Sequence, residues 1–121
     1  MRPLDCRKQN LLKALERAKS LPAVIVEGKK DFSAMAHLGF DNLVVLHKEG
    51  VSMHSVFDRI KGKECAILTD MDKKGNQYYD LLRKELGREG IKVNNELRRA
   101  ILANRISHIE GLATFVARIL P

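Results

Sequence analysis

The sequence predicts an α/β fold, with a parallel sheet of about four strands flanked by helices on both faces. Short apolar runs rich in β-branched residues recur along the chain, as in strands that are buried on both faces of a parallel sheet. Amphipathic segments of helical periodicity separate these runs, so strand and helix alternate over four units. Neither a repeat nor a linker interrupts the alternation, so residues 1–121 are expected to form a single domain.

The first elements have clear local signals. Leucines at helical spacing, with basic residues opposite them, predict a helix over residues 5–19, and Pro22 blocks its continuation. The apolar run 23–27 predicts a buried strand that ends in an acid. Asp31 is expected to cap the next helix, and Gly39 to close it.

The remaining elements repeat this alternation. Apolar runs predict strands at 42–46, 65–69 and 91–93, and the periodic segments between and after them predict helices at about 52–62 (capped by Ser52), 77–86, 94–102 and 112–120. In the helix at 77–86, Leu81, Leu82 and Leu86 are expected to face inward.

Charge and composition narrow the function. Lysine and arginine exceed aspartate and glutamate by 22 to 15, a net charge of +7, which favours a polyanionic partner such as nucleic acid. An ordinary charge-rich surface explains the same number. Aromatic residues make up only 5% of the chain, so base stacking is not the expected binding mode.

Localisation follows from what the sequence lacks. It has neither a bilayer-length apolar run nor the apolar core of a signal peptide, so the protein is expected to be cytoplasmic, with no membrane association. Cys6 and Cys65 stand far apart and in no metal-binding spacing, which predicts two reduced, structural thiols.

The most informative stretch is Asp70-Met71-Asp72, where a buried strand ends in two carboxylates followed by a basic, glycine-containing turn. Ligands gather at the carboxyl ends of parallel strands, and carboxylate oxygens are the ligands that Mg²⁺ prefers. The alternative is a helix start at which an aspartate caps the first turn. Lys73 and Lys74 fit either interpretation, as partners for phosphate or as offsets to the aspartates.

A second acidic strand end lies upstream, at Glu27-Gly28. Burial disfavours a charged carboxylate, so Glu27 is a candidate general acid or base whose pKa is expected to move toward neutrality. A glutamate that accepts backbone hydrogen bonds at a strand–helix turn is the alternative. Asp31 is a helix cap or a further acidic ligand.

A third candidate is the turn around His108 and Glu110. Two interpretations carry equal weight: these side chains line the same cleft as the acidic strand ends, or Ser107 and Glu110 form a capping box. His37, His47 and His54 have no partner at metal-binding spacing.

The strand that closes in Glu27-Gly28-x-x-Asp31 and the later strand that closes in Asp70-x-Asp72-x-x-Gly75 together resemble the Toprim domain. Toprim is the metal-binding module of topoisomerases, bacterial-type primases, some DNA-repair proteins and the ribonuclease that matures 5S ribosomal RNA. The resemblance covers about residues 22–95 and is strongest to small stand-alone Toprim proteins related to that ribonuclease. It implies a compact, Rossmann-like fold.

The resemblance also implies roles for the matching residues. Glu27 would be the general acid or base and a neighbour of the metal, while Asp70 and Asp72 would coordinate Mg²⁺, with Mn²⁺ as a substitute. The glycines after each motif are present as Gly28 and Gly75. A further acidic tail common after the second motif is absent, because Asn76 follows Gly75. His108 and Glu110 resemble a Glu/His turn of the ribonuclease group.

These residues predict metal-dependent phosphodiester chemistry on RNA, as in rRNA processing, or on DNA. Lys29, Lys30, Lys73 and Lys74 would hold the nucleic-acid backbone at one rim. The alternative is a non-catalytic module that binds nucleic acid or a ribonucleoprotein partner. Phosphatases of the haloacid dehalogenase type also use Asp-x-Asp, but after the first strand and with a threonine following, unlike this chain. P-loop, dinucleotide-binding and hydrolase-elbow motifs are absent.

Overall fold

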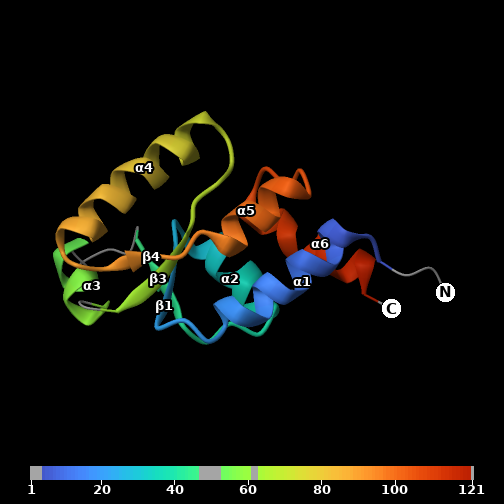
Figure 1. Ribbon diagram of the computed structural model, residues 1–121, viewed down its shortest axis with the longest axis horizontal. Helices are drawn as coiled ribbons and strands as arrows, with labels where there is room; N and C mark the ends of the chain where they lie inside the picture. The colour runs from blue at the N-terminus through green and yellow to red at the C-terminus, as the bar shows by residue number, and fades with distance from the viewer. Residues whose placement is uncertain (1–3, 47–52, 61–62, 121) are drawn as a thin grey trace.

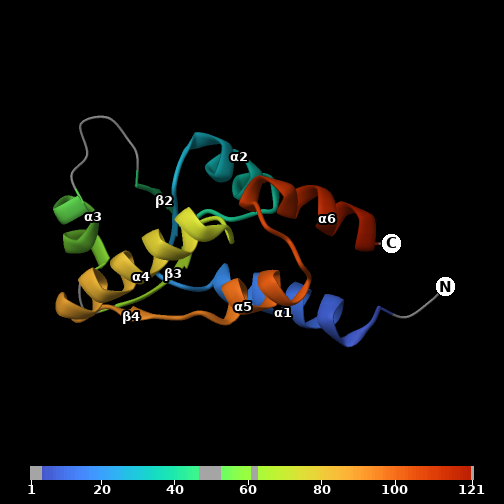
Figure 2. The same cartoon turned by 90° about the horizontal axis from the view of Figure 1, so that it is seen from above.

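The computed structural model describes residues 4–46, 53–60 and 63–120. It has the expected α/β architecture, with one sheet whose four strands are all parallel and helices on both faces (Figures 1 and 2). The predicted Ser52 cap, the residues around His47 and the helix end near Gly62 lie outside the described residues.

The strand order is β2-β1-β3-β4. The strands are β1 (Ala23–Val26), β2 (Leu43–Val45), β3 (Glu64–Leu68) and β4 (Lys92–Val93). The interior strands β1 and β3 pair in a register that sets Val26 beside Leu68, so both strands end at the same level. All of β1 and most of β3 are buried, as their apolar runs predicted, whereas β2 and β4 at the edges are only partly covered.

Alternate side chains of the interior strands enter two cores. Val24, Val26 and Leu68 contribute to one core, and Ile25 and Ile67 to the other. The helices are α1 (Cys6–Ala18), α2 (Lys29–His37), α3 (Met53–Ile60), α4 (Lys73–Arg88), α5 (Glu96–Ala103) and α6 (Leu112–Ile119), and η1 (Ile109–Gly111) is a single 3₁₀ turn. The first core is covered by α1, α2, α5 and α6, and the second by α3 and α4 (Figure 2).

Three local predictions are wrong. The fourth helix begins at Lys73 rather than Gln77, so the expected basic turn is the first turn of α4. Leu81 is 52% exposed, while Leu82 and Leu86 are buried as predicted. Asp31 is not a cap, because α2 begins at Lys29 and its N-cap residue is Gly28. Gly39 does end α2 with a positive φ of 96°, a conformation that glycine adopts without strain.

The topology has a switch point between β1 and β3. The chain leaves β1 toward β2 on one side and leaves β3 toward β4 on the other, so the strand order reverses between the two interior strands. In open α/β sheets, ligands bind outside the carboxyl ends of the strands at such a point. Among the described residues, no helix is long and apolar enough to cross a membrane.

Candidate metal centre

The first two acidic motifs meet at this switch point. Glu27 directly follows β1, and Asp70 follows β3 after one intervening residue. Because the two strands are neighbours in register, their exits lie side by side. The backbone N–H of Asp70 donates to Oε1 of Glu27 across a distance of 3.3 Å. Glu27 therefore accepts a backbone hydrogen bond, as one sequence interpretation proposed, and does so at the edge where the aspartates lie.

The third candidate segment joins them from the C-terminal part of the chain. The N–H of Met71 donates to the carbonyl oxygen of Ser107 at 2.8 Å. The N–H of Ile109 donates to Oδ1 of Asp70 at 2.9 Å. These two bonds fasten residues 107–109 to the turn between β3 and α4.

The capping-box interpretation of this segment is wrong. Oγ of Ser107 lies 2.8 Å from Nδ1 of His108, and the N-cap residue of η1 is His108, which makes no side-chain capping bond. The alternative holds geometrically, because His108 lies beside the aspartates and Glu110 lines a hollow together with Glu27 and Asp31.

Within the described residues, one group of side chains lies close enough together to hold a metal ion. Asp70, Asp72 and His108 each offer one ligand atom, and these atoms all lie within 4.8 Å of one another. Asp70 is half-buried, whereas Asp72 and His108 are exposed. Among the described residues, Glu27 does not belong to this mutual group, and it reaches Asp70 through the backbone hydrogen bond. The resemblance implied that Glu27 lies with the two aspartates at the metal. In the structure, the third side chain of this group is instead the imidazole of His108.

The aspartates also have structural bonds. Oδ1 of Asp72 accepts the N–H of Gly75 at 2.7 Å, so Asp72 is the N-cap residue of α4, as the cap interpretation proposed. Oδ1 of Asp70 accepts the N–H of Ile109. In both residues the bonded atom is Oδ1, and among the described residues Oδ2 has no hydrogen bond in either.

The carboxylates at this edge repel one another. Burial raises the pKa of Asp31, and the negative charges of Asp70, Glu27 and Glu110 raise it further, against the lowering effect of the Gly28 backbone N–H. A cation placed among these groups would relieve the repulsion. Burial also raises the pKa of Tyr78 on α4, with the charge of Glu27 as the second cause.

Arg98 of α5 is a buried cation next to the site, and it was not among the residues predicted from the sequence. Its guanidinium donates to the carbonyl oxygen of Thr69 at 2.7 Å and to that of Asp70 at 3.2 Å, and it stacks 4.3 Å from the ring centroid of Tyr79. Further bonds reach the Thr69 hydroxyl and Oδ1 of Asn76. Burial lowers the pKa of Arg98, although Tyr79 and nearby carboxylates oppose this effect. Arg98 therefore holds the backbone that presents Asp70.

Only glycine fits at position 75, because there is no space for a side chain. A Cβ atom added there would lie 1.9 Å from the carbonyl oxygen of Asp70. The first turn of α4 can approach the strand end so closely only without a side chain, which gives the glycine of the second motif a physical reason. Gly28 differs, because its φ of −146° suits any residue and its Cβ would meet nothing within 4 Å. The space and the backbone conformation at position 28 therefore do not require a glycine.

The four predicted lysines occupy equivalent positions in two helices. Lys29 and Lys30 begin α2, Lys73 and Lys74 begin α4, and all four are exposed. Positive charge in the first turn opposes the helix dipole and costs helix stability. Lys29 and Lys30 line the same open hollow as Glu27 and Glu110.

Comparisons with known proteins establish the family. A UPF0292 protein of Methanosarcina acetivorans is 35% identical over 96% of this chain and 83% of its own length. A UPF0292 protein of Archaeoglobus fulgidus is 30% identical over 86% of this chain and 84% of its own length. A solved structure of a protein from Aquifex aeolicus has a TM-score of 0.74 at 26% identity, covering 89% of this chain and 98% of that one. A scan against family models found no match. On the identity and coverage of these relatives, the chain belongs to the UPF0292 protein family.

Proposed function

We propose that this protein is a divalent-metal-dependent nuclease of Toprim type, acting on RNA or DNA. The observation that carries the proposal is the convergence of Asp70, Asp72 and His108 within 4.8 Å, at the topological switch point and beside Glu27. The resemblance of both acidic motifs to Toprim and the net charge of +7 support the same reaction class.

The donor set fits a hard or borderline divalent cation. Two carboxylates suit Mg²⁺, which keeps several waters when bound to proteins. The imidazole of His108 adds a ligand that transition metals accept more readily than Mg²⁺ does. Mg²⁺ and Mn²⁺ are therefore both candidates, and Mn²⁺ is expected to bind more tightly.

The residues divide the chemistry of phosphodiester hydrolysis between them. Asp70, Asp72 and His108 would hold the divalent ion, which would supply stabilisation of the negative charge that develops on the phosphate. Glu27 lies at the same edge and serves as the general acid or base that moves the proton of water or of the leaving oxygen. The exposed lysines at the starts of α2 and α4 attract the nucleic-acid backbone toward the carboxylates. Nothing in this division requires Tyr78, whose raised pKa keeps its phenol protonated.

The proposal is tested with labelled RNA and DNA panels incubated with Mg²⁺ or Mn²⁺. Glu27→Gln is expected to lower turnover by about 10²–10⁴-fold, the usual contribution of a general acid or base. Asp70→Asn should lower both turnover and metal affinity, which Mn²⁺ titration measures separately. Asp58→Asn, an exposed acid on α3, is the matched control and should cleave like the wild type. Equal cleavage by all four proteins would contradict the proposal.

A second candidate function is a non-catalytic module that binds nucleic acid. One observation favours it: Glu27, Asp70 and Asp72 each accept a backbone N–H, so each carboxylate has a structural task without any catalysis. Under this alternative, nucleic acid binds with a steep salt dependence, Glu27→Gln binds normally, and neither protein shows turnover. Metal-dependent turnover that Glu27→Gln abolishes would exclude the alternative.

A further inference from the structure

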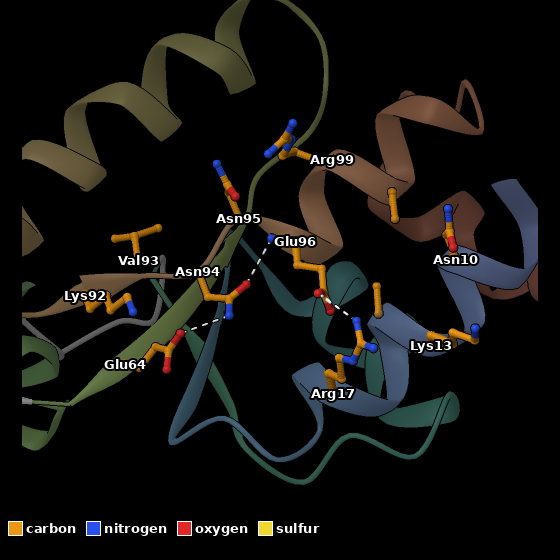
Figure 3. A pocket seen from close by; sticks show the side chains of 12 residues that line it. Asn10, Lys13, Arg17, Glu64, Lys92, Val93, Asn94, Asn95, Glu96 and Arg99 are labelled. Carbon is orange, nitrogen blue, oxygen red and sulfur yellow. Dashed lines mark hydrogen bonds and ion pairs between the residues drawn. The ribbon is translucent and has the colours of Figure 1, made fainter. Parts of the chain in front are cut away.

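A groove of about 650 Å³ lies between α1 and the segment that runs from β4 into α5. Figure 3 shows Lys13 and Arg17 on its α1 side, with Lys92 and Arg99 on the β4 and α5 side. Its lining shares no residue with the metal centre or with the hollow around Glu27. The metal chemistry therefore leaves this groove unexplained.

The charge balance of the groove is positive. Four cationic side chains line it against two acids, and both acids are already engaged. Oε2 of Glu96 accepts from Arg17 at 2.9 Å, and Oε2 of Glu64 accepts from the Asn94 amide at 2.9 Å (Figure 3). Lys13, Lys92 and Arg99 are exposed and form no ion pair within the described part of the chain.

The polar side chains of the lining point to a backbone-binding surface. Asn10 and Asn95 add amide groups that can donate to phosphate or sugar oxygens, and the Asn95 side chain does not cap α5. No aromatic side chain is among the lining residues, so unstacked bases would find no platform here. A base-paired helix, which presents its phosphates outward, matches this chemistry better than an open strand does.

The two neighbouring arginines of α5 serve different surfaces. Arg98 is buried beneath Asp70, whereas Arg99 is exposed in the groove. The same helix thus supports the metal centre on one side and borders the groove on the other. A nucleic acid held in the groove would be bound next to the helix that positions the carboxylates.

We propose that the groove between α1 and the β4–α5 segment binds the sugar–phosphate backbone of a base-paired nucleic acid through Lys13, Lys92 and Arg99. The inference rests on the proposed function for the class of partner, since a nuclease needs a surface that holds its substrate. It adds a binding surface outside the metal centre, which acts whether or not a metal is present.

The test measures binding of a labelled RNA duplex by fluorescence anisotropy in EDTA, over a series of salt concentrations. The triple variant Lys13→Gln, Lys92→Gln, Arg99→Gln should bind at least about tenfold more weakly at 0.1 M salt. The slope of log K against log salt is negative, and it should become shallower by about 2.7, because each phosphate that is no longer neutralised reduces its magnitude by about 0.9. Arg17 is kept, because its removal would leave Glu96 unpaired.

A matched control variant removes the same charge from other surfaces: Arg83→Gln, Lys84→Gln, Arg118→Gln. These three side chains are exposed, form no ion pair among the described residues, and line neither the groove nor the metal centre. The control should keep most of the wild-type affinity and slope. Thermal melting by circular dichroism verifies that both variants fold.

Each outcome decides one question. An equal loss of duplex affinity in both triple variants would overturn the proposed role of the groove, because net charge alone would then explain binding. No loss of affinity in either variant would overturn it as well, because the three groove side chains would then not contact the duplex. Tighter binding of a matched single strand than of the duplex would overturn the preference for base-paired nucleic acid. Wild-type protein that binds through the groove but shows no turnover with Mg²⁺ or Mn²⁺ would refute the nuclease and leave the groove standing.

Discussion

At the scale of single residues, Asp70 is positioned from several directions. Arg98 donates to its carbonyl oxygen, Ile109 donates to its carboxylate, and Gly75 packs against its backbone without a side chain. Its own N–H is bonded to Glu27. A ligand held by this many interactions is preorganised, so a bound cation would not have to order it.

Gly75→Ala tests this close packing. The new methyl group would meet the Asp70 carbonyl oxygen at 1.9 Å, so either the first turn of α4 or the Asp70 backbone must move. We expect a loss of about 1–3 kcal/mol in the free energy of unfolding, as in other overpacked sites, together with weaker Mn²⁺ binding. Urea denaturation measures the first effect and Mn²⁺ titration the second.

Gly87→Ala is the control in the same helix. A Cβ at Gly87 would meet nothing within 4 Å, and alanine favours helix over glycine by roughly 0.5–1 kcal/mol. This variant should be as stable as the wild type or slightly more stable, with unchanged metal affinity. If Gly75→Ala behaved like Gly87→Ala, steric exclusion would not be the reason for the glycine in the second motif.

At the scale of elements, residues 107–111 complete the candidate site. This segment joins the β3–α4 turn through the Met71–Ser107 and Asp70–Ile109 bonds, and in doing so it brings His108 to the aspartates. It begins two residues after Arg105, whose φ of 57° lies in the left-handed region. The chain direction set after α5 thus decides whether His108, the third candidate ligand, reaches the two aspartates.

His108→Ala should lower Mn²⁺ affinity by about tenfold or more, because an imidazole ligand is removed while both aspartates remain. Mg²⁺ affinity should fall less, since Mg²⁺ prefers oxygen ligands. Isothermal titration with each metal measures the two affinities. His54→Ala, an exposed histidine on α3, should change neither. Equal affinities in wild type and His108→Ala would remove His108 from the ligand set.

The sequence was sufficient to predict the four strands and to predict that the two acidic motifs lie at the same edge of the sheet. The run from Ala23 to Val26 is apolar at every position, and an acid directly after a buried strand can only lie at the end of the sheet. The start of α4 was predicted too late, because Asp72 could be a cap or a metal ligand and a glycine lies in the first turn. Tertiary packing decides both points, since Gly75 is there for the Asp70 carbonyl.

The buried arginine and the third segment needed the structure. Arg98 and Arg99 are adjacent, and only the apolar positions Leu97 and Ile101 indicate which of them turns inward. Arg98 lies three residues before Ile101 and next to Leu97, so it borders the buried side of the helix, which is a signal that helical periodicity could have supplied. For His108 the sequence left a cleft position and a capping box equally open, because the approach of His108 to Asp70 depends on how the turn after α5 folds back.

At the scale of the whole molecule, the sheet lies between the two cores, and the same strands contribute side chains to both. Cys65 lies in the core beneath α3 and α4, while its neighbour Ala66 points into the opposite core. Adjacent residues of β3 thus belong to different clusters, so neither core can lose its packing without disturbing the strand that the other requires. We therefore expect both cores to unfold in a single cooperative transition.

The two cysteines report on this transition. Both thiols are free, Cys6 is exposed and Cys65 is buried, and burial raises the pKa of Cys65 to about 12. In the native protein at pH 8, a thiol reagent should label Cys6 rapidly and Cys65 only through unfolding, because labelling needs both access and the thiolate. In a Cys6→Ser variant, the urea midpoint for Cys65 labelling should coincide with the midpoint of helix loss by circular dichroism.

The sign of the pH effect follows from the same pKa. The unfolded thiol ionises near its ordinary pKa of 9.0, while the folded thiol keeps its proton up to about 12, so the folded state binds more protons between these values. Cys65 therefore lowers the free energy of unfolding as the pH rises above 9, by at most about 1.4 kcal/mol per pH unit, and has no effect on it below pH 9.

Labelling of Cys65 at a urea concentration well below the circular dichroism midpoint would show that the α3–α4 core opens alone, contrary to a single transition through β3.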